Sequence, residues 1–348
     1  MKKMLKNFSK KIEKKIFLGI LLLGTVLLLY GCNFNTELKS KKSVEKVTIG
    51  IQSSPAMALV MVAEDEGFFD QAGIDVEIKE FTAGKFALEA FLGGSLDFAV
   101  SGDVPVTLSS LKGSKFVVPA QVVKKTTNEV RVVARKDFDL DSHNAKNYFK
   151  TKKRKLSTSF GGGPEFFTFE FLEKLNIQDN EIELISQAPK DMAASLISGG
   201  VDAVAIFDPI AFIIENQMGN KAVTFTDPNI YSELYVIEAQ ESIKNNPEPL
   251  KKVIKGLLAA EKFTAKNPER AKEIVIKYTK LDKSTVDGIW DNFDFKVALT
   301  PELLEFWDKQ IDWLKLKNKI PQGAKIPNFR EILFEAPLKE ISPTSVNI

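Results

Sequence analysis

Four turns in this chain combine small or capping residues with a proline, and a ligand could meet free backbone N–H groups at each of them. Each turn follows an apolar run that predicts a strand and precedes a run that predicts a helix. Proline is tolerated in the first helical turn because the N–H groups there have no intrahelical partner. Such helix ends bind anions without lysine or arginine. The four turns are Ser53-Ser54-Pro55, Gly102-Asp103-Val104-Pro105, Gly161-Gly162-Gly163-Pro164 and Asp208-Pro209.

One such turn alone predicts no more than the start of a helix, and Asp208 has a simple alternative role as the N-cap of its own helix. The triple-glycine turn is more specific. Three consecutive glycines cost conformational entropy and add no packing, so they indicate a backbone that comes close to another group. The turn matches neither GxGxxG nor GxxxxGK[ST], which argues against nucleotide binding.

Strands and helices alternate along most of the chain, and this order must position the turns. Two runs of alternation, 47–123 and 156–225, each predict a parallel-type sheet covered by helices, whereas residues after 237 predict helices only. These later helices are expected at 248–266, 268–278, 284–292 and 301–316. Ligands of open α/β sheets bind beyond the carboxyl ends of the strands. Two lobes that face each other by these ends would enclose a small ligand.

An internal echo supports two related lobes. Residues 91–98 and 197–203 each end a predicted helix at a glycine pair, continue to an aspartate and enter a strand. The two strands then run to the turns at 102–105 and 208–209. With 348 residues, the chain is also longer than one ordinary hydrophobic core requires.

The first 31 residues predict an export signal rather than part of the fold. Seven lysines precede an apolar run at 16–30, which is shorter than the roughly 20 residues of a membrane-spanning helix. Leu29-Tyr30-Gly31-Cys32 resembles the bacterial lipobox, whose cysteine is acylated. We therefore expect an extracytoplasmic body held at a membrane by lipid on Cys32, with residues 32–45 as a polar tether. An uncleaved N-terminal anchor is the alternative.

The composition fits a folded globular protein, with 44% hydrophobic and 27% charged residues. Cys32 is the only cysteine, which excludes an internal disulfide, a CxxC redox pair and a Cys-rich zinc site. Residues 1–31 hold seven lysines and one acid, so the remaining chain has 41 basic and 45 acidic residues and a net charge of −4. Together with the lack of a basic patch bearing aromatic residues, this predicts no nucleic-acid binding.

Several segments resemble, in order, one family: the nitrate/sulfonate/taurine group of ABC importer binding proteins, which is related to thiamine-pyrimidine binders. The resemblance covers about 45–320 and is specific for the group but not for the solute. It implies an α/β, two-lobed periplasmic-binding-protein-like fold of type II, with two crossover hinge segments near 123–135 and 226–240. Lobe I would comprise 46–125 and 236–348, and lobe II 126–235. The segments are 66–76 (EGFFDQAGIDV), 81–88 (FTAGKFAL), 94–98 (GSLDF), 102–105 (GDVP) and 201–209 (VDAVAIFDP).

The resemblance also implies which residues line the cleft between the lobes. Serine and threonine hydroxyls and backbone N–H groups would bind the oxygens of an anion. The expected residues are Gln52, Ser53, Ser54, Thr82, Gly84, Lys85, Ser101, Gly102 and Asp103 from lobe I, and Gly161, Gly162, Gly163, Glu165 and Asp208 from lobe II.

Acids in this set constrain the solute. A buried carboxylate that faces an anion without a partner is costly, so Asp103, Glu165 and Asp208 do not suit a simple anion. A zwitterion such as an aminosulfonate could place its ammonium on one of them. The alternative is a neutral aromatic solute, such as a thiamine-precursor-like pyrimidine, stacked on Phe160 or Phe207.

The expected partners are the small solute, an ABC permease with its ATPase, and the membrane through the lipid; we expect a monomer without cofactor, metal or catalytic residues. Enzymes of thiamine-pyrimidine synthesis share this fold but need histidine chemistry, and the only histidine, His143, lies in the polar stretch 137–154. HExxH, GxSxG and Cys–His pairing are missing from the sequence. Two further functions stay open, those of a solute-reading partner of a membrane receptor and of a purely structural lipoprotein.

Overall fold

Two β-sheets organise the chain in the computed structural model, which describes residues 44–126, 129–137, 144–227 and 229–348. Glu45–Ile348 form one compact unit that contains both sheets. The predicted signal, Cys32, most of the tether and His143 lie outside the described residues. Within the described ranges, the structure has no helix that is both long enough and apolar enough to cross a membrane.

The first sheet has the strand order β11-β4-β10-β3-β1-β2. β1 pairs in parallel with β2 and β3, whereas β10 runs antiparallel to both β3 and β4. Its strands are β1 (Glu45–Gln52), β2 (Ile74–Phe81), β3 (Phe98–Gly102), β4 (Val117–Lys125), β10 (Leu234–Ala239) and β11 (Phe293–Ala298). We call this sheet and its helices lobe I. The helices are η1 (Pro55–Met57), α2 (Ala58–Asp65), α3 (Phe68–Gln71), α4 (Gly84–Leu92), α5 (Asp103–Leu111), η4 (Glu241–Asn245), α10 (Glu248–Lys266), α11 (Pro268–Thr279), α12 (Lys283–Ile289), η5 (Trp290–Asn292), α13 (Pro301–Leu316), α14 (Phe329–Ile332), α15 (Ala336–Ile341) and η6 (Pro343–Ser345).

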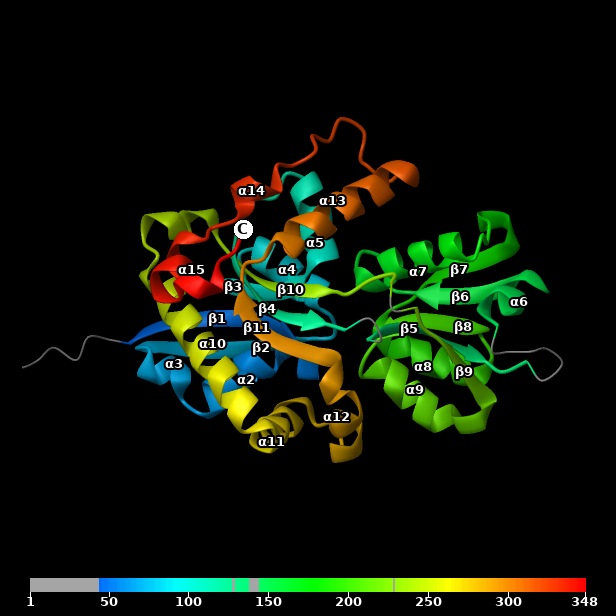
Figure 1. Ribbon diagram of the computed structural model, residues 1–348, viewed down its shortest axis with the longest axis horizontal. Helices are drawn as coiled ribbons and strands as arrows, with labels where there is room; N and C mark the ends of the chain where they lie inside the picture. Colours follow the sequence, from blue (N-terminus) through cyan, green and yellow to red (C-terminus); the bar gives the residue numbers. More distant parts are fainter. Residues whose placement is uncertain (1–43, 127–128, 138–143, 228) are drawn as a thin grey trace, which may run out of the picture. The chain divides into compact units, whose positions relative to one another are not determined.

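The second sheet has the order β7-β6-β8-β5-β9, and we call it, with its helices, lobe II. Helix α7 covers one face of this sheet and helices α8 and α9 cover the other (Figure 1). The strands are β5 (Val130–Arg135), β6 (Arg154–Thr158), β7 (Ile182–Ser186), β8 (Ala203–Phe207) and β9 (Ala222–Phe225). The helices are α6 (Ala145–Lys150), α7 (Gly163–Lys174), η2 (Asp179–Glu181), α8 (Pro189–Ser198), α9 (Ile210–Met218) and η3 (Gly219–Lys221).

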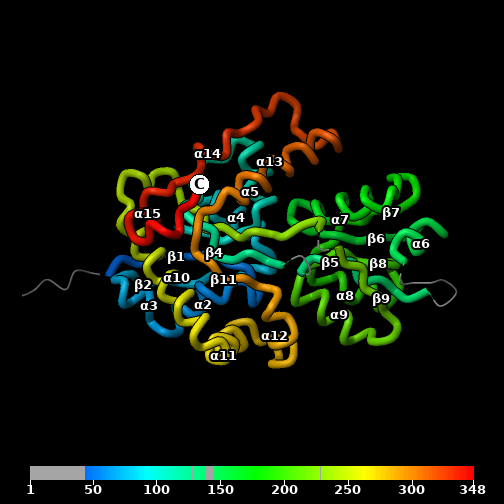
Figure 2. The backbone as a smooth tube through the Cα atoms, viewed as in Figure 1, coloured from blue at the N-terminus to red at the C-terminus, as the bar shows by residue number. Residues whose placement is uncertain are grey.

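The chain passes between the sheets twice, from β4 to β5 and from β9 back to β10 (Figure 2). The predicted α/β fold with two crossing segments is therefore confirmed. β10 begins at Leu234, two residues before the predicted return to lobe I at 236. It remains a prediction that the two lobes move as separate bodies, with lobe I formed by 46–125 and 236–348 and lobe II by 126–235.

Two expectations about single elements are wrong. Residues after 237 are not helical only, because β11 adds an antiparallel edge strand beside β4. Residues 123–135 are not one crossing segment, because Val130–Arg135 form β5, which pairs with β8 and β9. Both strands are only six residues long. They are stabilised by pairing with strands that are distant in the sequence, and their own local sequence pattern does not predict them.

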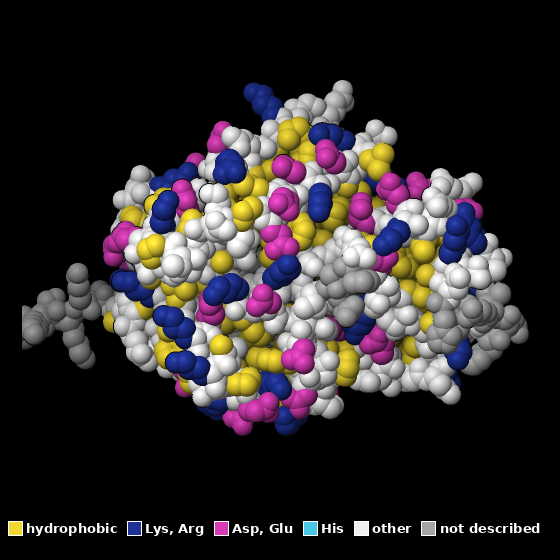
Figure 3. Space-filling model, in the orientation of Figure 1, with side chains coloured by type: hydrophobic (Ala, Val, Ile, Leu, Met, Phe, Trp, Pro, Cys, Tyr) yellow, Lys and Arg dark blue, Asp and Glu magenta, His cyan; other side chains and the backbone are white. Residues whose placement is uncertain are grey.

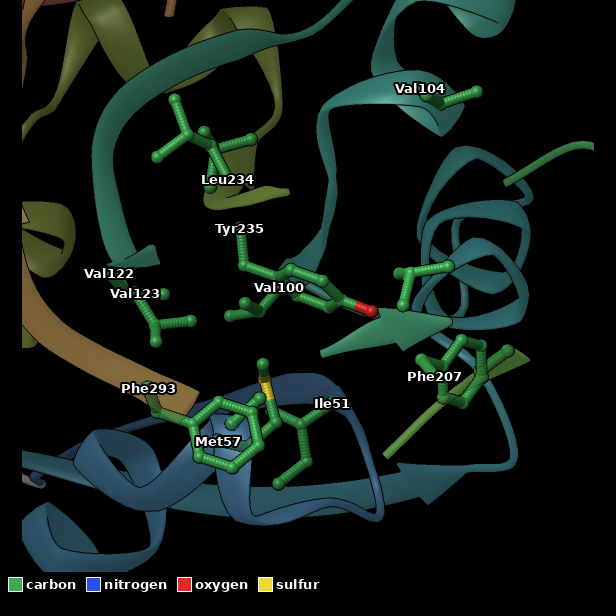
Figure 4. Close-up of a cluster of buried hydrophobic side chains, with 14 of the residues drawn as sticks. Ile51, Met57, Val100, Val104, Val122, Val123, Phe207, Leu234, Tyr235 and Phe293 are labelled. Carbon is green, nitrogen blue, oxygen red and sulfur yellow. The ribbon is translucent and has the colours of Figure 1, made fainter. Parts of the chain in front are cut away.

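The core of lobe I lies between the sheet and its helices. Ile51, Met57, Val100, Val123 and Phe293 belong to a cluster of buried side chains that Figure 4 shows in close-up. Each such side chain contributes about 1.5–3 kcal/mol through its burial. All five residues of β3 and all five of β8 are buried, as expected for central strands covered on both faces.

Helices of lobe I also contact lobe II at two places. Trp313 of α13 packs its ring on Phe166 and Phe169 of α7, with centroid separations of 5.3 and 5.9 Å. Gly288 of α12 lies so close to α9 that a Cβ atom there would come within 2.3 Å of the Phe212 ring. Helices α13 and α12 thus each pack lobe I against lobe II.

Candidate functional site

Two of the predicted turns face each other across a small cavity between the sheets. Gly102 of the second turn and Gly162 and Gly163 of the third line its two walls. The cavity has a volume of about 20 Å³. This is room for about one water molecule, so the walls are nearly in contact. The complete lining is Ala83, Gly84, Lys85, Gly102 and Pro105 from lobe I, Ser159, Gly162, Gly163, Pro164 and Phe207 from lobe II, and Glu233 and Tyr235 from the second connection and β10.

Glu233 explains why glycine stands on both walls. A Cβ atom on Gly102 would lie 2.5 Å from Oε1 of Glu233, and a Cβ atom on Gly163 would lie 2.5 Å from the same oxygen. Gly163 is also tight against Tyr231, whose Cε1 would be 3.0 Å from that Cβ. The two glycines therefore let two backbone segments from different lobes approach one buried carboxylate.

Lys125, at the end of β4, lies behind Glu233 and is fully buried. Its Nζ forms ion pairs with Glu233 Oε2 at 2.9 Å and Glu129 Oε1 at 2.8 Å. The ammonium also lies 4.4 Å from the ring centroid of Tyr235 and 5.1 Å from that of Phe207. Figure 4 shows the Tyr235 hydroxyl pointing toward Phe207. Burial alone lowers the pKa of Lys125, but Glu129 and Glu233 more than offset this and raise the pKa.

Asp103 is a second buried carboxyl group beside Glu233. Its Oδ1 accepts hydrogen bonds from the Tyr231 hydroxyl and, at 2.8 Å, from the Val104 amide. Its Oδ2 accepts no hydrogen bond. Burial, followed by the charge of Glu233, raises the pKa of Asp103 to about 8.

Glu129 is the third buried carboxyl group. Its Oε1 lies 2.8 Å from Nζ of Lys125, whereas its Oε2 accepts no hydrogen bond. Burial raises the pKa of Glu129 to about 8, although Lys125 opposes this effect. Two buried carboxyl groups, those of Glu129 and Glu233, therefore flank one buried ammonium, and the third, Asp103, lies beside Glu233. This acid excess is internal, because all three side chains are buried. On the face shown in Figure 3, basic and acidic side chains are interspersed.

Five of the predicted site residues line the cavity, and Lys85 joins its two walls. Gly84, Lys85, Gly102, Gly162 and Gly163 are the five. Nζ of Lys85, in the first turn of α4, donates to Ser159 Oγ at 3.2 Å and to the Phe160 carbonyl at 2.6 Å. Burial is the largest influence on the pKa of Lys85 and lowers it.

Two predicted acids bind other groups rather than the cavity, and Asp208 is the first. It pairs with Arg131 at 2.9 Å and accepts hydrogen bonds from Asn292 Nδ2 and from the amide of Phe212 in the first turn of α9. Burial nevertheless raises the pKa of Asp208. Asp208 therefore connects β8, β5 and the segment before β11, and it also serves the start of its own helix.

Glu165 occupies the first turn of α7 and stabilises the triple-glycine turn. Its Oε2 accepts from the Gly161 amide at 2.7 Å, and its Oε1 pairs with Lys319, which follows α13. Gly161 has a φ of +81°, in the left-handed region that favours glycine. Glu165 thus orders the loop and joins it to lobe I.

The remaining predicted residues lie around the start of the lobe I helices. Gln52 is buried and accepts a hydrogen bond from Tyr235 at 2.6 Å, and Ser101 donates to Glu238 at 2.5 Å. Ser54 caps η1, where its side chain accepts from Ala56 N. The Ser53 amide donates to the Phe81 carbonyl at 2.8 Å, and Thr82 is exposed. Of these residues, Gln52 and Ser101 are hydrogen-bonded to cavity residues, Gln52 to Tyr235 and Ser101 to the carbonyl of Gly102 at 3.5 Å.

Sequence reasoning missed the groups at the centre of the cluster. Lys125, Glu129, Tyr231, Glu233 and Tyr235 all lie in the two segments expected to cross between the lobes, 123–135 and 226–240. The one sequence feature that could have indicated them is that ionisable side chains stand directly beside the apolar segments that predict buried strands. The strand ends that indicate ligand groups are those that precede helices, and none of these five residues lies at such an end. In the part of the chain that is described, no group of three or more His, Cys, Asp and Glu side chains is arranged to hold a metal ion.

Comparisons with known proteins agree with this architecture. Residues 40–277 match the family model described as the NMT1-like family. A putative binding protein of Brucella abortus is 24% identical over 236 residues, which are 66% of this chain and 70% of that protein. The formylaminopyrimidine-binding protein of Halalkalibacterium halodurans is 22% identical over 329 residues, 88% of this chain and 96% of that one.

A solved structure supports the fold. The alkanesulfonate-binding protein SsuA of Xanthomonas axonopodis pv. citri, bound to MOPS, superposes with a TM-score of 0.71 at 17% identity. The match covers 84% of this chain and 98% of that one. The expected two-lobed binding-protein fold is thereby confirmed.

Proposed function

The chain belongs to the NMT1-like family, and from this premise we propose that it is an extracytoplasmic solute-binding protein that delivers its solute to an ABC-type importer. The observation that carries the proposal is the cavity at Glu233, whose walls come from both lobes. A site divided between two lobes binds by hinge closure around the solute. The Brucella and Halalkalibacterium relatives, which match over 70% and 96% of their own length, carry binding-protein names, which supports binding rather than catalysis.

Closure is the step that the geometry supports best. The connections from β4 to β5 and from β9 to β10 are the only covalent links between the two sheets within the described chain and can act as hinges. A solute enters while the walls are apart, because the cavity in its present form holds about one water molecule. Lys85 then joins α4 to the Ser159–Phe160 segment, which closes the cavity from the side.

The solute we propose is small and either zwitterionic or an amino-substituted heterocycle. The buried carboxyl groups of Asp103, Glu129 and Glu233 do not suit nitrate or a simple sulfonate, because an anion beside them would be repelled. The sulfonate part of a zwitterion would bind at the helix starts of α4 and α7. The name of the Halalkalibacterium relative supports the heterocyclic alternative.

We further propose that Cys32 is acylated and that residues 33–45 tether the body to the membrane. Cells that express the full chain with Cys32→Ser should release the protein from the membrane fraction and incorporate no labelled fatty acid. Retention of both properties in the variant would contradict the lipid anchor, and would leave the binding function as a separate question.

A thermal-shift screen of residues 33–348 tests the binding function. The panel contains taurine, ethanesulfonate, nitrate, bicarbonate and aminopyrimidines. A bound solute at 100 times its Kd adds about 2.7 kcal/mol to the free energy of unfolding, which raises Tm by several degrees. Failure of every compound to raise Tm would contradict the proposal and favour a structural lipoprotein. Turnover of a stabilising compound by the purified protein would instead favour an enzyme.

A further inference from the structure

The buried carboxyl groups around Glu233 outnumber the cations that pair with them. Asp103, Glu129 and Glu233 are at most 3% exposed, and Lys125 is the one cation that pairs with any of them in the described structure. Oδ2 of Asp103 and Oε2 of Glu129 accept no hydrogen bond. An unpaired buried carboxylate is costly, so folded proteins normally provide it with donors or a cation. The oxygens of these carboxyl groups therefore lack hydrogen-bond donors, such as N–H groups.

The surroundings of Lys125 show what kind of group this cluster can hold. Its ammonium is bound between two carboxylates, those of Glu129 and Glu233. Two aromatic rings, of Tyr235 and Phe207, lie 4.4 and 5.1 Å from the same nitrogen. Carboxylates and aromatic faces are the groups with which proteins bind organic cations. Glu233 and both aromatic residues also line the cavity, so a solute would meet the same chemistry from the other side.

We infer that the cleft recognises its solute through a protonated nitrogen, an ammonium or an amidinium-type group, which binds the carboxylate of Glu233 and is balanced by Glu129 and Asp103. This inference rests on the proposed function, because it concerns the same cavity, and it names the chemistry of the solute. Glu233 Oε1 is the contact atom, since it lies between Gly102 and Gly163 at the cavity wall. The rest of the solute would extend toward the helix starts of α4 and α7.

An anion bound to Lys125 is the contrary arrangement, and the contacts disfavour it. Lys125 is fully buried and already has both Glu129 and Glu233 as partners. An anion would have to displace one of them and leave it buried without a cation. A cation at Glu233 requires no such displacement, because it adds positive charge to a cluster with three acids and one ammonium.

The same charge balance predicts that Asp103 and Glu129 release protons when a cation binds beside them. The groups that face Asp103 and Glu129 are Glu233, Tyr231 and Lys125, with the Arg131–Asp208 pair on the lobe II side. At pH 7 the raised pKa of Asp103 keeps this group largely protonated, and the raised pKa of Glu129 makes its carboxylate readily protonated in spite of the pair with Lys125. A cation that binds beside them favours their ionised forms. Its affinity should therefore increase between pH 6 and pH 9, whereas the affinity of an anion should decrease.

The test is a thermal-shift screen of residues 33–348 with two sets of compounds matched in size. One set carries a protonated nitrogen and includes taurine, benzamidine and 4-aminopyridine. The other lacks it and includes ethanesulfonate, benzamide and nitrate, and both sets are extended with metabolites sorted by the same criterion. We expect stabilisation in the first set, with a Kd by calorimetry that falls at least threefold from pH 6 to pH 8. Glu233→Gln should raise this Kd at least tenfold, whereas Glu183→Gln, an exposed acid of lobe II, should leave it unchanged.

Each result of the screen decides one of the two claims. Stabilisation by the nitrogen-free set alone, or a Kd that rises with pH, would overturn the inference and leave the proposed function intact. Failure of both sets would contradict the proposed function itself. Should Glu233→Gln fail to give a cooperative thermal transition, Glu129→Gln replaces it, with an expected loss of affinity in the same direction. An unchanged Kd in that variant would also overturn the inference.

Discussion

Gly162 and Gly163 are adjacent in the chain but have opposite surroundings. A Cβ atom on Gly163 would lie 2.5 Å from the Glu233 carboxylate, whereas the nearest atom to a Cβ on Gly162 is Pro164 Cδ at 3.7 Å. Gly162 also has an extended backbone, with a φ of −149°, that other residues adopt without strain. Glycine at 163 is thus required by packing, and glycine at 162 leaves space beside the cavity.

Gly162→Val should abolish solute-induced stabilisation while the fold is retained. The added methyl groups would occupy the cavity, whose volume is only about 20 Å³, and the Cβ atom would meet lobe II only in ordinary contact with Pro164 at 3.7 Å. Tm of the free protein should change by a few degrees at most. Gly163→Ala is the matched contrast, since overpacking against Glu233 should lower the free energy of unfolding by about 1–3 kcal/mol. Solute binding that persists in Gly162→Val would show that the site lies elsewhere.

Lys125→Met should be among the most destabilising single changes in the body. It leaves Glu129 and Glu233 buried without their cation, which typically costs about 3–5 kcal/mol when one partner of a buried pair is removed. Urea unfolding at pH 7.5 measures the loss. The loss should be smaller at pH 5, where the carboxyl groups are more readily protonated. Lys85→Met, at the cavity rim, is the control and should cost less than about 1 kcal/mol.

Stability of the free protein should fall as pH rises from about 5 to 8. Unfolded Asp and Glu lose their protons near pH 4, whereas Asp103 and Glu129 keep theirs until about pH 8 because of burial. The folded state therefore binds more protons in this window, and each group contributes a decline of up to roughly 1.4 kcal/mol per pH unit. Asp103→Asn should reduce the slope in urea titrations, and Glu183→Gln should not. A flat or rising profile for the wild type would contradict the assigned burial.

Lys319→Met should weaken solute binding by favouring the open arrangement. Lys319 pairs with Glu165 of lobe II and lies 4.4 Å from the ring centroid of Phe169. The pair is partly exposed, so its loss should cost about 1 kcal/mol, equivalent to a several-fold higher Kd. Calorimetry measures the change, and Lys315→Met, at an exposed position in the last turn of α13, is the control. If Lys319→Met and Lys315→Met changed the Kd equally, Lys319 would have no specific role in closure.

The sequence predicts the fold and the facing turns well because both depend on local pattern. Alternating strands and helices, the glycine pairs and the prolines after strands are readable signals, and Gly102 and Gly163 indeed meet at one carboxylate. The edge strand Phe293–Ala298 escaped prediction because its partner, β4, lies more than 160 residues earlier in the chain. This pairing is a tertiary contact, which the local periodicity of the sequence does not predict.

The centre of the site was harder to predict for a related reason. Lys125 and Glu233 are 108 positions apart and become partners only when the two connections lie side by side. Neither residue has a neighbouring motif, and a charged residue next to a strand usually faces solvent. The predicted acids Glu165 and Asp208 were recognisable from the sequence, but their partners Lys319 and Arg131 were not.

The most direct test of the two-lobed cleft is a distance measurement between spin labels on the lobes. Cys32 is the only cysteine, so residues 33–348 with Lys112→Cys and Lys190→Cys carry one label on exposed sites of each lobe. We predict a broad or long distance distribution for the free protein and a single shorter distance with the strongest stabilising compound of the screen. An identical distribution with and without a compound that demonstrably binds would contradict closure around a shared cavity.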